Sequence, residues 1–168
     1  MEYIKTINSP LGCIILKSDG VNLTGLCFEK QKNKKDEIND NLILFNQVED
    51  WLKKYFQGNN CPISFTIKPQ GTQFQQLVWQ KLLEIPYGQT VSYDDIAREV
   101  AQITGKRKCP QAIGQAVKRN PIGIIIPCHR VIGKQGDLTG YAGGMDKKIF
   151  LLQLEKANFT NSYIQDKK

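Results

Sequence analysis

The sequence contains a single histidine and no pair of cysteines spaced as C-x-x-C. Zinc sites are usually built from such spaced cysteines and histidines, so their scarcity argues against a metal centre. The five cysteines are an odd number scattered along the chain, which argues against a disulfide framework in a reducing compartment. Cys13 and Cys27 lie in apolar runs and are predicted to be small core residues, although a link between them is left open.

Long apolar runs are also absent. No stretch approaches the roughly 18 residues that a membrane-spanning helix needs. The N-terminal segment from Met1 to Lys5 lacks the charged, apolar and small-residue order of a secretory signal. We therefore expect an intracellular, cytoplasmic protein with no membrane partner.

The composition is that of a globular protein with a basic balance. Of 168 residues, 40% are hydrophobic and 23% are charged, which suits one ordinary domain or a small domain packed on a second. The net charge of +7, from 23 Lys and Arg against 16 Asp and Glu, suits nucleic acid, an anionic membrane or an acidic partner, and equally a merely soluble surface. Many of the basic residues gather in one stretch, at Lys106-Arg107-Lys108, Lys118-Arg119, Arg130 and Lys134.

The N-terminal part of the chain predicts short strands followed by a helix. Residues 11–17 and 21–28 are apolar runs bounded by turn-forming Gly, Ser, Asp and Pro, which is typical of a small antiparallel meander. Apolar residues at helical spacing predict a helix over residues 45–56, and the alternation at 63–67 predicts a final strand. This region carries no evident chemistry.

The chain divides at a short linker, residues 68–71. We assign residues 1–67 to an N-terminal domain and residues 72–168 to a second, helix-rich domain. Thr72 is a candidate N-cap for a helix that ends near Glu84.

Two further segments predict a helix-turn-helix. One helix follows Ser92 over residues 93–100, and the other opens at Pro110 and ends near Lys118, with a polar and basic turn between them. Alternate Ala and Gly residues in the second helix would let its backbone approach DNA closely. The same small residues also suit close helix packing, so they do not decide the function alone.

The candidate chemistry centres on Cys128, which follows an apolar, strand-like run at residues 122–126. Burial usually leaves such a cysteine inert, because it raises the pKa of the thiol. The neighbouring His129 could take the thiol proton directly or through one water, provided that another group orients the imidazole. The residues alone do not identify the orienting acid, and a buried cysteine beside a surface histidine is the simpler alternative.

The segment Pro127-Cys128-His129-Arg130-Val131-Ile132-Gly133 resembles the active-site signature of the O6-alkylguanine-DNA alkyltransferases, also called methylated-DNA–protein-cysteine methyltransferases. The resemblance covers residues 69–156, while the N-terminal third is similar only in size and strand pattern. The other matching motifs are Thr72-Gln73-Phe74-Gln75, Val78-Trp79, Ile85-Pro86-Tyr87-Gly88, Ser92-Tyr93, Ala112-Ile113-Gly114, Arg119-Asn120-Pro121, Gly140-Tyr141-Ala142-Gly143-Gly144 and Leu151-Leu152-Gln153-Leu154-Glu155.

This resemblance implies both a fold and an activity. The fold would be of the α+β class, with an RNase H-like N-terminal α/β domain and a C-terminal helical, winged-helix-like domain that contains the helix-turn-helix. The activity would be a single, irreversible transfer of an alkyl group from O6-alkylguanine in DNA to Cys128 after the nucleotide is flipped out of the helix. We expect no cofactor and no metal. The partner would be double-stranded DNA that carries the lesion, and the protein would be a monomer, associated with the nucleoid in a prokaryote.

The resemblance also implies a role for each catalytic residue. Cys128 would be the nucleophile, His129 would deprotonate it through a bridging water, and Glu155 would orient and stabilise the resulting imidazolium. Asn120 would brace the turn that holds the cysteine. Tyr93 would help to rotate the nucleotide and would donate a hydrogen bond to the guanine, at N3.

A substrate pocket and a DNA-contacting surface are implied in the same way. The expected pocket residues are Tyr93, Val131, Tyr141, Ala142 and Gly143. The expected DNA contacts are Ser92, Gln111, Ala112, Gly114, Lys118, Arg119, Arg130 and Lys134.

Two positions depart from the family pattern. Gln111 stands where many members carry an arginine that fills the gap left by the flipped base. Base flipping would therefore be weaker, or the gap would be filled in another way. The basic run at residues 106–108 is a candidate to compensate by binding phosphate. Ala142 stands where some members carry serine. Whether O4-alkylthymine is accepted is left open.

Three other functions compete with this interpretation. A non-catalytic sensor of alkylated DNA would lack the active-site cysteine, which is present as Cys128. A transcription regulator would be expected to carry an additional regulatory domain, which is not evident. A cysteine hydrolase would turn over repeatedly on an acyl substrate and would not explain a basic helix-turn-helix.

Overall fold

The structure is a computed structural model that describes residues 2–29, 41–136, 138, 141 and 143–157. The chain folds as two compact units. The first comprises residues up to Gln70 together with Pro121–Gly123, and the second comprises Gly71–Asn120 and the residues from Ile124 onward. The return of three residues to the first unit is a feature that a linear division of the sequence does not anticipate.

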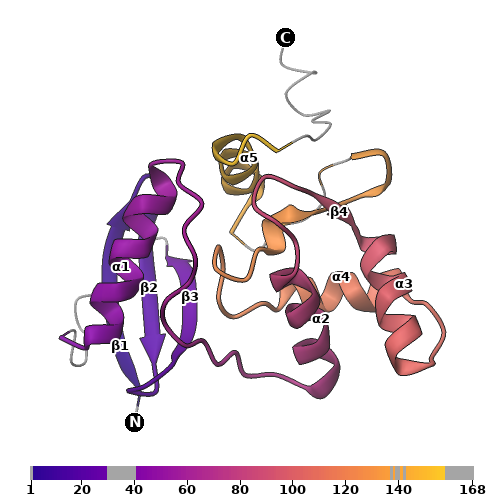
Figure 1. Cartoon of the computed structure of the whole chain (residues 1–168), viewed down its shortest axis with the longest axis horizontal. Helices are drawn as coiled ribbons and strands as arrows, with labels where there is room; N and C mark the ends of the chain where they lie inside the picture. Colours follow the sequence, from indigo (N-terminus) through magenta and orange to yellow (C-terminus); the bar gives the residue numbers. More distant parts are fainter. Residues whose placement is uncertain (1, 30–40, 137, 139–140, 142, 158–168) are drawn as a thin grey trace. The chain divides into compact units, whose positions relative to one another are not determined.

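The first unit contains an antiparallel sheet in the order β1-β2-β3 (Figure 1). Its strands are β1 (Tyr3–Ser9), β2 (Gly12–Ser18) and β3 (Leu23–Glu29). The second and third strands confirm the predicted meander, whereas β1 was not predicted. The turn before β3 is held by Asp19, whose carboxylate accepts hydrogen bonds from the backbone N–H groups of Val21 at 2.9 Å and Asn22 at 2.7 Å.

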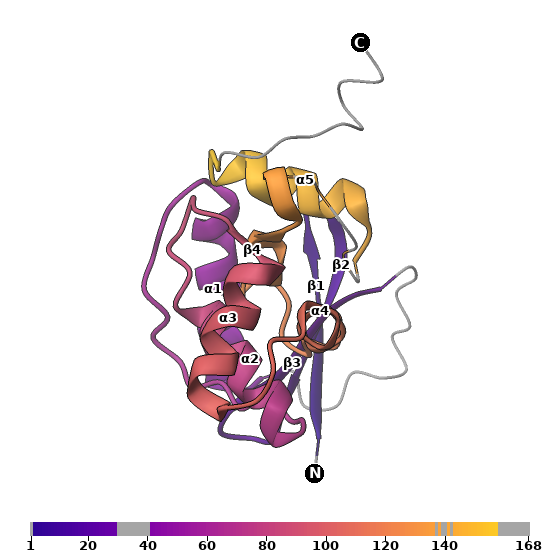
Figure 2. The ribbon, with the colours of Figure 1, turned by 90° about the vertical axis from the view of Figure 1, so that its right-hand side faces the viewer.

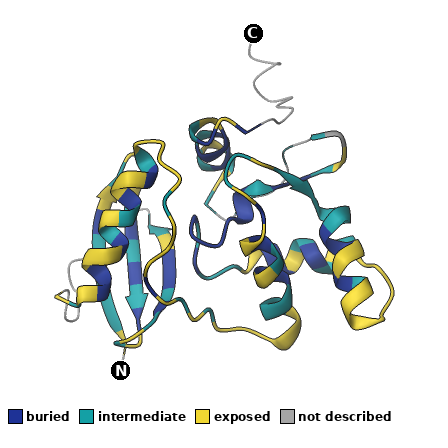
Figure 3. Ribbon diagram, in the orientation of Figure 1, coloured by how far each residue is buried: buried dark blue, intermediate teal, exposed yellow. Residues whose placement is uncertain are grey.

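Helix α1 (Ile43–Phe56) lies across one face of this sheet (Figure 1). Its inner side is buried and its outer side is exposed, as the alternating colours of Figure 3 show. The fully buried residues Phe45 and Val48 of α1, with Ile14 and Leu16 of β2, form the apolar core of this unit. The predicted helix over 45–56 is therefore confirmed.

The prediction that Cys13 and Cys27 are core residues is wrong for Cys27, which is exposed, while Cys13 is partly buried. Strand alternation is the reason, because it directs Ile14 and Leu16 toward the covered face and their neighbours to the other face. Both cysteines are free thiols.

Two segments predicted as strands form only single bridges to β3. In the first segment, predicted over 63–67, Ile67 alone pairs with Leu23. In the second, predicted over 122–126, only Ile122 pairs, with Leu26. The chain then leaves the extended conformation at Ile124, whose φ is 67°.

In the second unit, the helices α2 (Gln73–Leu83), α3 (Tyr93–Thr104) and α4 (Pro110–Lys118) cluster together, and α4 is seen end-on in Figure 2. Thr72 and Ser92 cap α2 and α3 with reciprocal capping boxes, as their side-chain chemistry predicts. The helix α3 is a turn longer than predicted, because it ends at Gly105 in the left-handed conformation. The sequence-predicted helix-turn-helix is therefore present as α3 and α4.

Short elements connect the helices to the candidate site. The strand β4 (Val91–Ser92) pairs in parallel with β5 (Val131–Ile132). A helical turn, Cys128–Arg130, immediately precedes β5, and Tyr93 immediately follows β4. Because the two strands run parallel, the Cys-His segment leads into the start of this small sheet, and Tyr93 follows at its other end. The last helix, α5, spans Met145–Leu154.

None of the helices in the described parts of the chain is long and apolar enough to cross a membrane.

Candidate active site

Cys128 lies in a tight turn and is 6% exposed. Its backbone N–H donates to the carbonyl oxygen of Ile126 at 2.8 Å. The same carbonyl accepts a hydrogen bond from Nδ2 of Asn120, also at 2.8 Å. The side chain of Asn120 therefore holds the turn that presents the sulfur.

The turn is entered through a strained residue. Ile124 has a φ of 67° and is buried. A β-branched residue in the left-handed region costs on the order of 1–3 kcal/mol and persists only where its surroundings hold it. The path of the chain into Cys128 is thus fixed by packing rather than by the local preference of the sequence.

The environment of the Cys128 thiol acts on its pKa in two directions. Burial raises the pKa of the thiol above its ordinary value. A hydrogen bond from the side chain of Asn120 and the positive charge of Lys148 oppose that rise. The resting cysteine is therefore a thiol that needs a base to become a nucleophile.

His129 and Glu155 form a buried pair, with 2.5 Å between Nε2 of the ring and Oε2 of the carboxylate. Burial raises the pKa of Glu155, but the hydrogen bonds from His129 and Arg130 outweigh burial and bring the pKa to about 2. Burial lowers the pKa of His129, and the carboxylate of Glu155 only partly restores it. The carboxylate is thus ionised and the resting imidazole is neutral.

This pairing decides which ring nitrogen can act as a base. An ionised carboxylate can only accept hydrogen bonds, so Nε2 of His129 must carry the ring proton and donate it to Glu155. In the neutral ring the lone pair then lies on Nδ1. Together, these residues, which we call the Cys128–His129–Glu155 triad, supply a thiol, a neutral imidazole of fixed tautomer and a carboxylate that orients the imidazole.

Arg130 supports this triad. Its Nε donates to Oε1 of Glu155 at 2.7 Å, and its Nη1 donates to the carbonyl oxygen of Ile85 at 2.7 Å. The same Oε1 accepts from the backbone N–H of Gly88 at 3.0 Å. Arg130 is one of the predicted DNA contacts, but its side chain is only 12% exposed and lies beside the carboxylate.

Lys148 is a further buried residue of the site, and the sequence analysis did not select it. Its Nζ donates to the carbonyl oxygen of Val131 at 2.7 Å and lies 6.0 Å from the centre of the Tyr93 ring. Burial lowers the pKa of Lys148 to about 8, and the thiolate form of Cys128 would act against that shift. Helical spacing could have revealed it, because Lys148 shares the buried face of α5 with Leu151, Leu152 and then Glu155.

The predicted pocket residues gather in part around Cys128. Tyr93 is the first residue of α3, and a Cβ on Gly114 of α4 would lie 4.0 Å from its ring. Burial raises the pKa of Tyr141, and the thiolate form of Cys128 would add to that rise. Val131 is buried in β5. Ala142 lies outside the described residues, and its neighbour Gly143 is partly buried.

The predicted DNA contacts on α4 and at its end differ in exposure. Gln111, Lys118 and Arg119 are exposed, whereas Ala112 and Gly114 are partly buried. Lys134 is also exposed. The hydroxyl of Ser92 caps α3 by accepting a hydrogen bond from the N–H of Asp95 at 3.0 Å.

Comparison with known proteins assigns both parts of the chain to one family. Residues 73–157 match the family model of the 6-O-methylguanine DNA methyltransferase DNA-binding domain, and residues 3–69 match that of its ribonuclease-like domain. The methylated-DNA–protein-cysteine methyltransferase of Haemophilus influenzae is 41% identical over 99% of this chain and 93% of its own length. The protein of the same name from Methanosarcina barkeri is 45% identical over 93% of this chain and 98% of its own.

A solved structure gives the same result for the fold. The Mycobacterium tuberculosis OGT, crystallised in complex with DNA, is 40% identical and superimposes with a TM-score of 0.79 over 92% of each chain. The predicted fold class, a ribonuclease-like domain followed by a helical DNA-binding domain, is confirmed. The chain therefore belongs to the 6-O-methylguanine DNA methyltransferase family.

Proposed function

We propose that this chain repairs DNA by transferring an alkyl group from O6 of guanine to the sulfur of Cys128, once per molecule. The observation that carries the proposal is the triad, in which an ionised Glu155 fixes a neutral His129 next to a buried cysteine. Relatives that cover nearly the whole chain and are named methylated-DNA–protein-cysteine methyltransferases support the same activity.

The transfer needs one proton movement and one displacement. Nδ1 of His129 takes the proton of Cys128, directly or through one water, and leaves a thiolate. The sulfur attacks the alkyl carbon, so that a C–S bond forms while the bond from that carbon to O6 breaks. The departing guanine takes up a proton, and the protein keeps a thioether. Nothing in this sequence regenerates the thiol, so the reaction stops at one equivalent.

Charges around the triad favour this step. The carboxylate of Glu155 stabilises the imidazolium that forms on His129, and Arg130 holds the carboxylate in place. Lys148, as a buried cation near the sulfur, stabilises the thiolate. We infer that Arg130 serves the triad rather than the DNA surface, since its guanidinium is engaged with Glu155 and Ile85.

The target base must leave the duplex to reach Cys128, because the cysteine is buried and O6 of guanine lies within the stack. We assign the recognition surface to the outer side of α4, with Gln111, Lys118 and Arg119, and to the exposed Lys134. Tyr93 would face the flipped nucleotide from the start of α3. A protein with this substrate would act where the chromosome lies, in the cytoplasm and at the nucleoid of a prokaryotic cell.

The alternative of a non-catalytic damage sensor is not favoured. Such a protein needs no nucleophile, whereas Cys128 here is accompanied by a base and an orienting acid. The names of the relatives likewise point to transfer.

Mass spectrometry after incubation with duplex DNA that contains O6-methylguanine tests the proposal. One methyl group is expected on the Cys128 peptide, saturating at one per molecule, and none in the Cys128→Ser variant. Tight binding without a modified cysteine would instead identify a sensor, and neither binding nor transfer would refute the assignment. A parallel duplex with O4-methylthymine establishes whether that lesion is also a substrate.

A further inference from the structure

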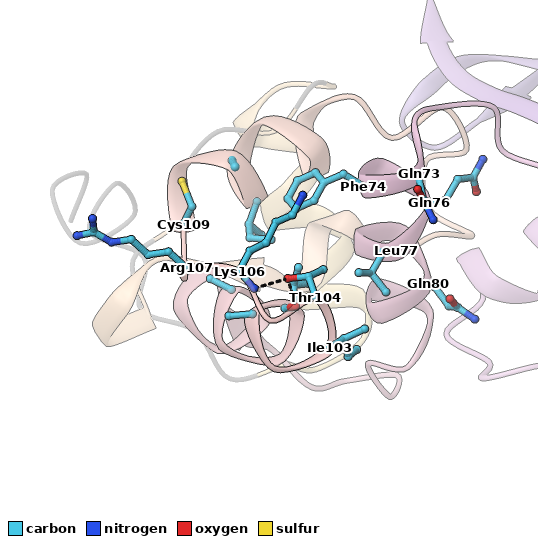
Figure 4. Close-up of a pocket in the computed structure, with 15 residues that line it drawn as sticks. Gln73, Phe74, Gln76, Leu77, Gln80, Ile103, Thr104, Lys106, Arg107 and Cys109 are labelled. Carbon is cyan, nitrogen blue, oxygen red and sulfur yellow. Dashed lines mark hydrogen bonds between the residues drawn. The ribbon is translucent and has the colours of Figure 1, made fainter.

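The second unit carries a hollow of about 830 Å³ that is lined by α2, α3, the turn that follows α3 and the start of α4 (Figure 4). Its inner surface is apolar and includes the buried residues Ala97 and Val100 of α3 and Ile113 of α4. Leu77 of α2 lines the opposite side. No member of the Cys128–His129–Glu155 triad lines this hollow, so it is separate from the proposed chemistry.

Two large apolar side chains on this hollow remain exposed. Phe74 of α2 is 38% exposed and Ile103 of α3 is 55% exposed. They come from different helices and border one cavity, so they extend its apolar surface outward. Exposed apolar side chains at the border of a cavity are typical of interaction sites in soluble proteins.

The same hollow is basic where α3 ends. Gly105, with a φ of 69°, terminates α3, and the backbone N–H of Lys106 donates to Oγ1 of Thr104 at 3.3 Å. This turn brings Lys106 and Arg107 onto the lining. In Figure 4 the Lys106 side chain extends toward Phe74, and the Arg107 guanidinium points outward at the edge of the hollow. Acidic side chains are absent from the lining, and among the described residues no ion pair engages either cation. Lys108, in contrast, is bound to Asp94 at 2.7 Å.

Polar groups on α2 complete the lining. Gln73, Gln76 and Gln80 each carry an amide that can both donate and accept hydrogen bonds. Amides beside an apolar floor suit a peptide, whose backbone also needs donors and acceptors.

We propose that this hollow docks an amphipathic segment of a partner protein, in which apolar side chains are followed by acidic ones. The apolar side chains would pack between Phe74 and Ile103, and the acidic ones would pair with Lys106 and Arg107. Duplex DNA fits less well, because its anionic phosphate backbone would lie against both exposed apolar side chains. Cys109, which precedes α4, and Ala112 of α4 also line the hollow, so the partner would lie beside the helix that we assign to DNA.

A peptide of this chemistry tests the proposal. The probe is a fluorescein-labelled helical peptide with two leucines one turn apart, followed by aspartates, and its anisotropy is measured during titration with the full chain. Saturable binding is expected, and Phe74→Ser or Ile103→Ser should each weaken it about tenfold. Leu83→Ser is the matched control, because Leu83 is 41% exposed on the same helix as Phe74 but does not line the hollow.

The charged end is tested with the double variant Lys106→Gln, Arg107→Gln. It should weaken binding and should remove the preference for the aspartate peptide over a peptide with asparagines in its place. Alkyl transfer to Cys128 is measured on Phe74→Ser and Ile103→Ser and should be unchanged, which shows that the variants are folded.

Two results would overturn the proposal. One is the absence of saturable binding of the aspartate peptide to the wild-type chain. The other is a loss of affinity for undamaged duplex DNA in Phe74→Ser and Ile103→Ser as large as the loss for the peptide, which would make the hollow part of the DNA surface.

Discussion

The Cys128 site and the outer side of α4 belong to the same unit but are built in different ways. In the site, polar groups are buried and hold one another: Glu155 alone accepts from His129, Arg130 and the backbone of Gly88. On α4, in contrast, each polar residue is individually exposed to solvent. A change in the first region therefore leaves buried partners unpaired, whereas a change in the second removes one contact with a ligand.

This difference teaches that the two regions should respond to mutation on different scales. Residues that share a hydrogen-bond network show large and non-additive effects, while separate surface residues act nearly independently. Four substitutions, from the largest expected effect to the smallest, test that contrast.

Glu155→Gln should have the largest effect. The neutral amide cannot stabilise the imidazolium of His129, and Arg130 loses the anion with which it pairs. We expect single-turnover alkyl transfer at saturating DNA to slow by about a hundredfold to ten-thousandfold. Glu84→Gln, at an exposed position on the same unit, is the control. A folded Glu155→Gln protein with the wild-type rate would show that the base needs no carboxylate.

Lys148→Met should slow transfer about tenfold at neutral pH, which corresponds to about 1.4 kcal/mol in the barrier, because the cation near the thiolate is lost. Stability should change in a different way. The pKa of Lys148 is about 8 in the folded chain against an ordinary 10.5, so the unfolded chain binds more protons between these values. The titration of Lys148 should thus make the wild-type free energy of unfolding rise between pH 8 and pH 10.5. The Lys148→Met variant should lack this rise.

Denaturant titrations across this pH range measure the stability effect, and single-turnover kinetics measure the rate. Lys53→Met, at an exposed position in the first unit, is the control for both. Unchanged transfer in Lys148→Met would remove Lys148 from the group that supports the thiolate.

Lys118→Gln should have a smaller and purely binding effect. The loss of one phosphate contact should weaken binding to undamaged duplex about threefold and lower the slope of log affinity against log salt by about one. Transfer at saturating DNA should stay at the wild-type rate, with Lys53→Gln as the control. A slower transfer at saturating DNA would show that Lys118 takes part in the alkyl-transfer step, which would contradict the contrast between the two regions.

Gln111→Arg should have the smallest effect, an increase of about twofold in affinity for lesion-bearing duplex, because a longer and charged side chain would fill the gap beside the flipped base. Fluorescence of a 2-aminopurine next to the lesion reports the flipping itself. No increase in either measurement would show that Gln111 does not face the gap.

Local signals in the sequence predicted the helices of the second unit well. Thr72 and Ser92 begin helices through their own side-chain hydrogen bonds, and Pro110 fits the first turn of α4. These features depend on neighbours a few residues away, so they can be read directly. The end of α3 was missed by one turn because Gly105, rather than the polar run before it, stops the helix.

Contacts between distant residues could not be read in this way. Arg130 was grouped with surface cations, since nothing near it in the sequence shows that its guanidinium reaches Glu155, 25 residues later. The apolar run around Ile124 resembles a strand, and only the packing of the folded chain imposes its left-handed conformation. The unit division was likewise hidden, because Pro121–Gly123 pairs with β3 across most of the chain.

The burial of Cys128 has a consequence for the life of each molecule. Cys128 is 6% exposed in a turn held by Asn120, so a group added to its sulfur stays enclosed by its neighbours. Overfilling a packed interior typically costs about 1–3 kcal/mol. A molecule that has reacted is then less stable than one that has not. The melting temperature therefore distinguishes used from unused molecules.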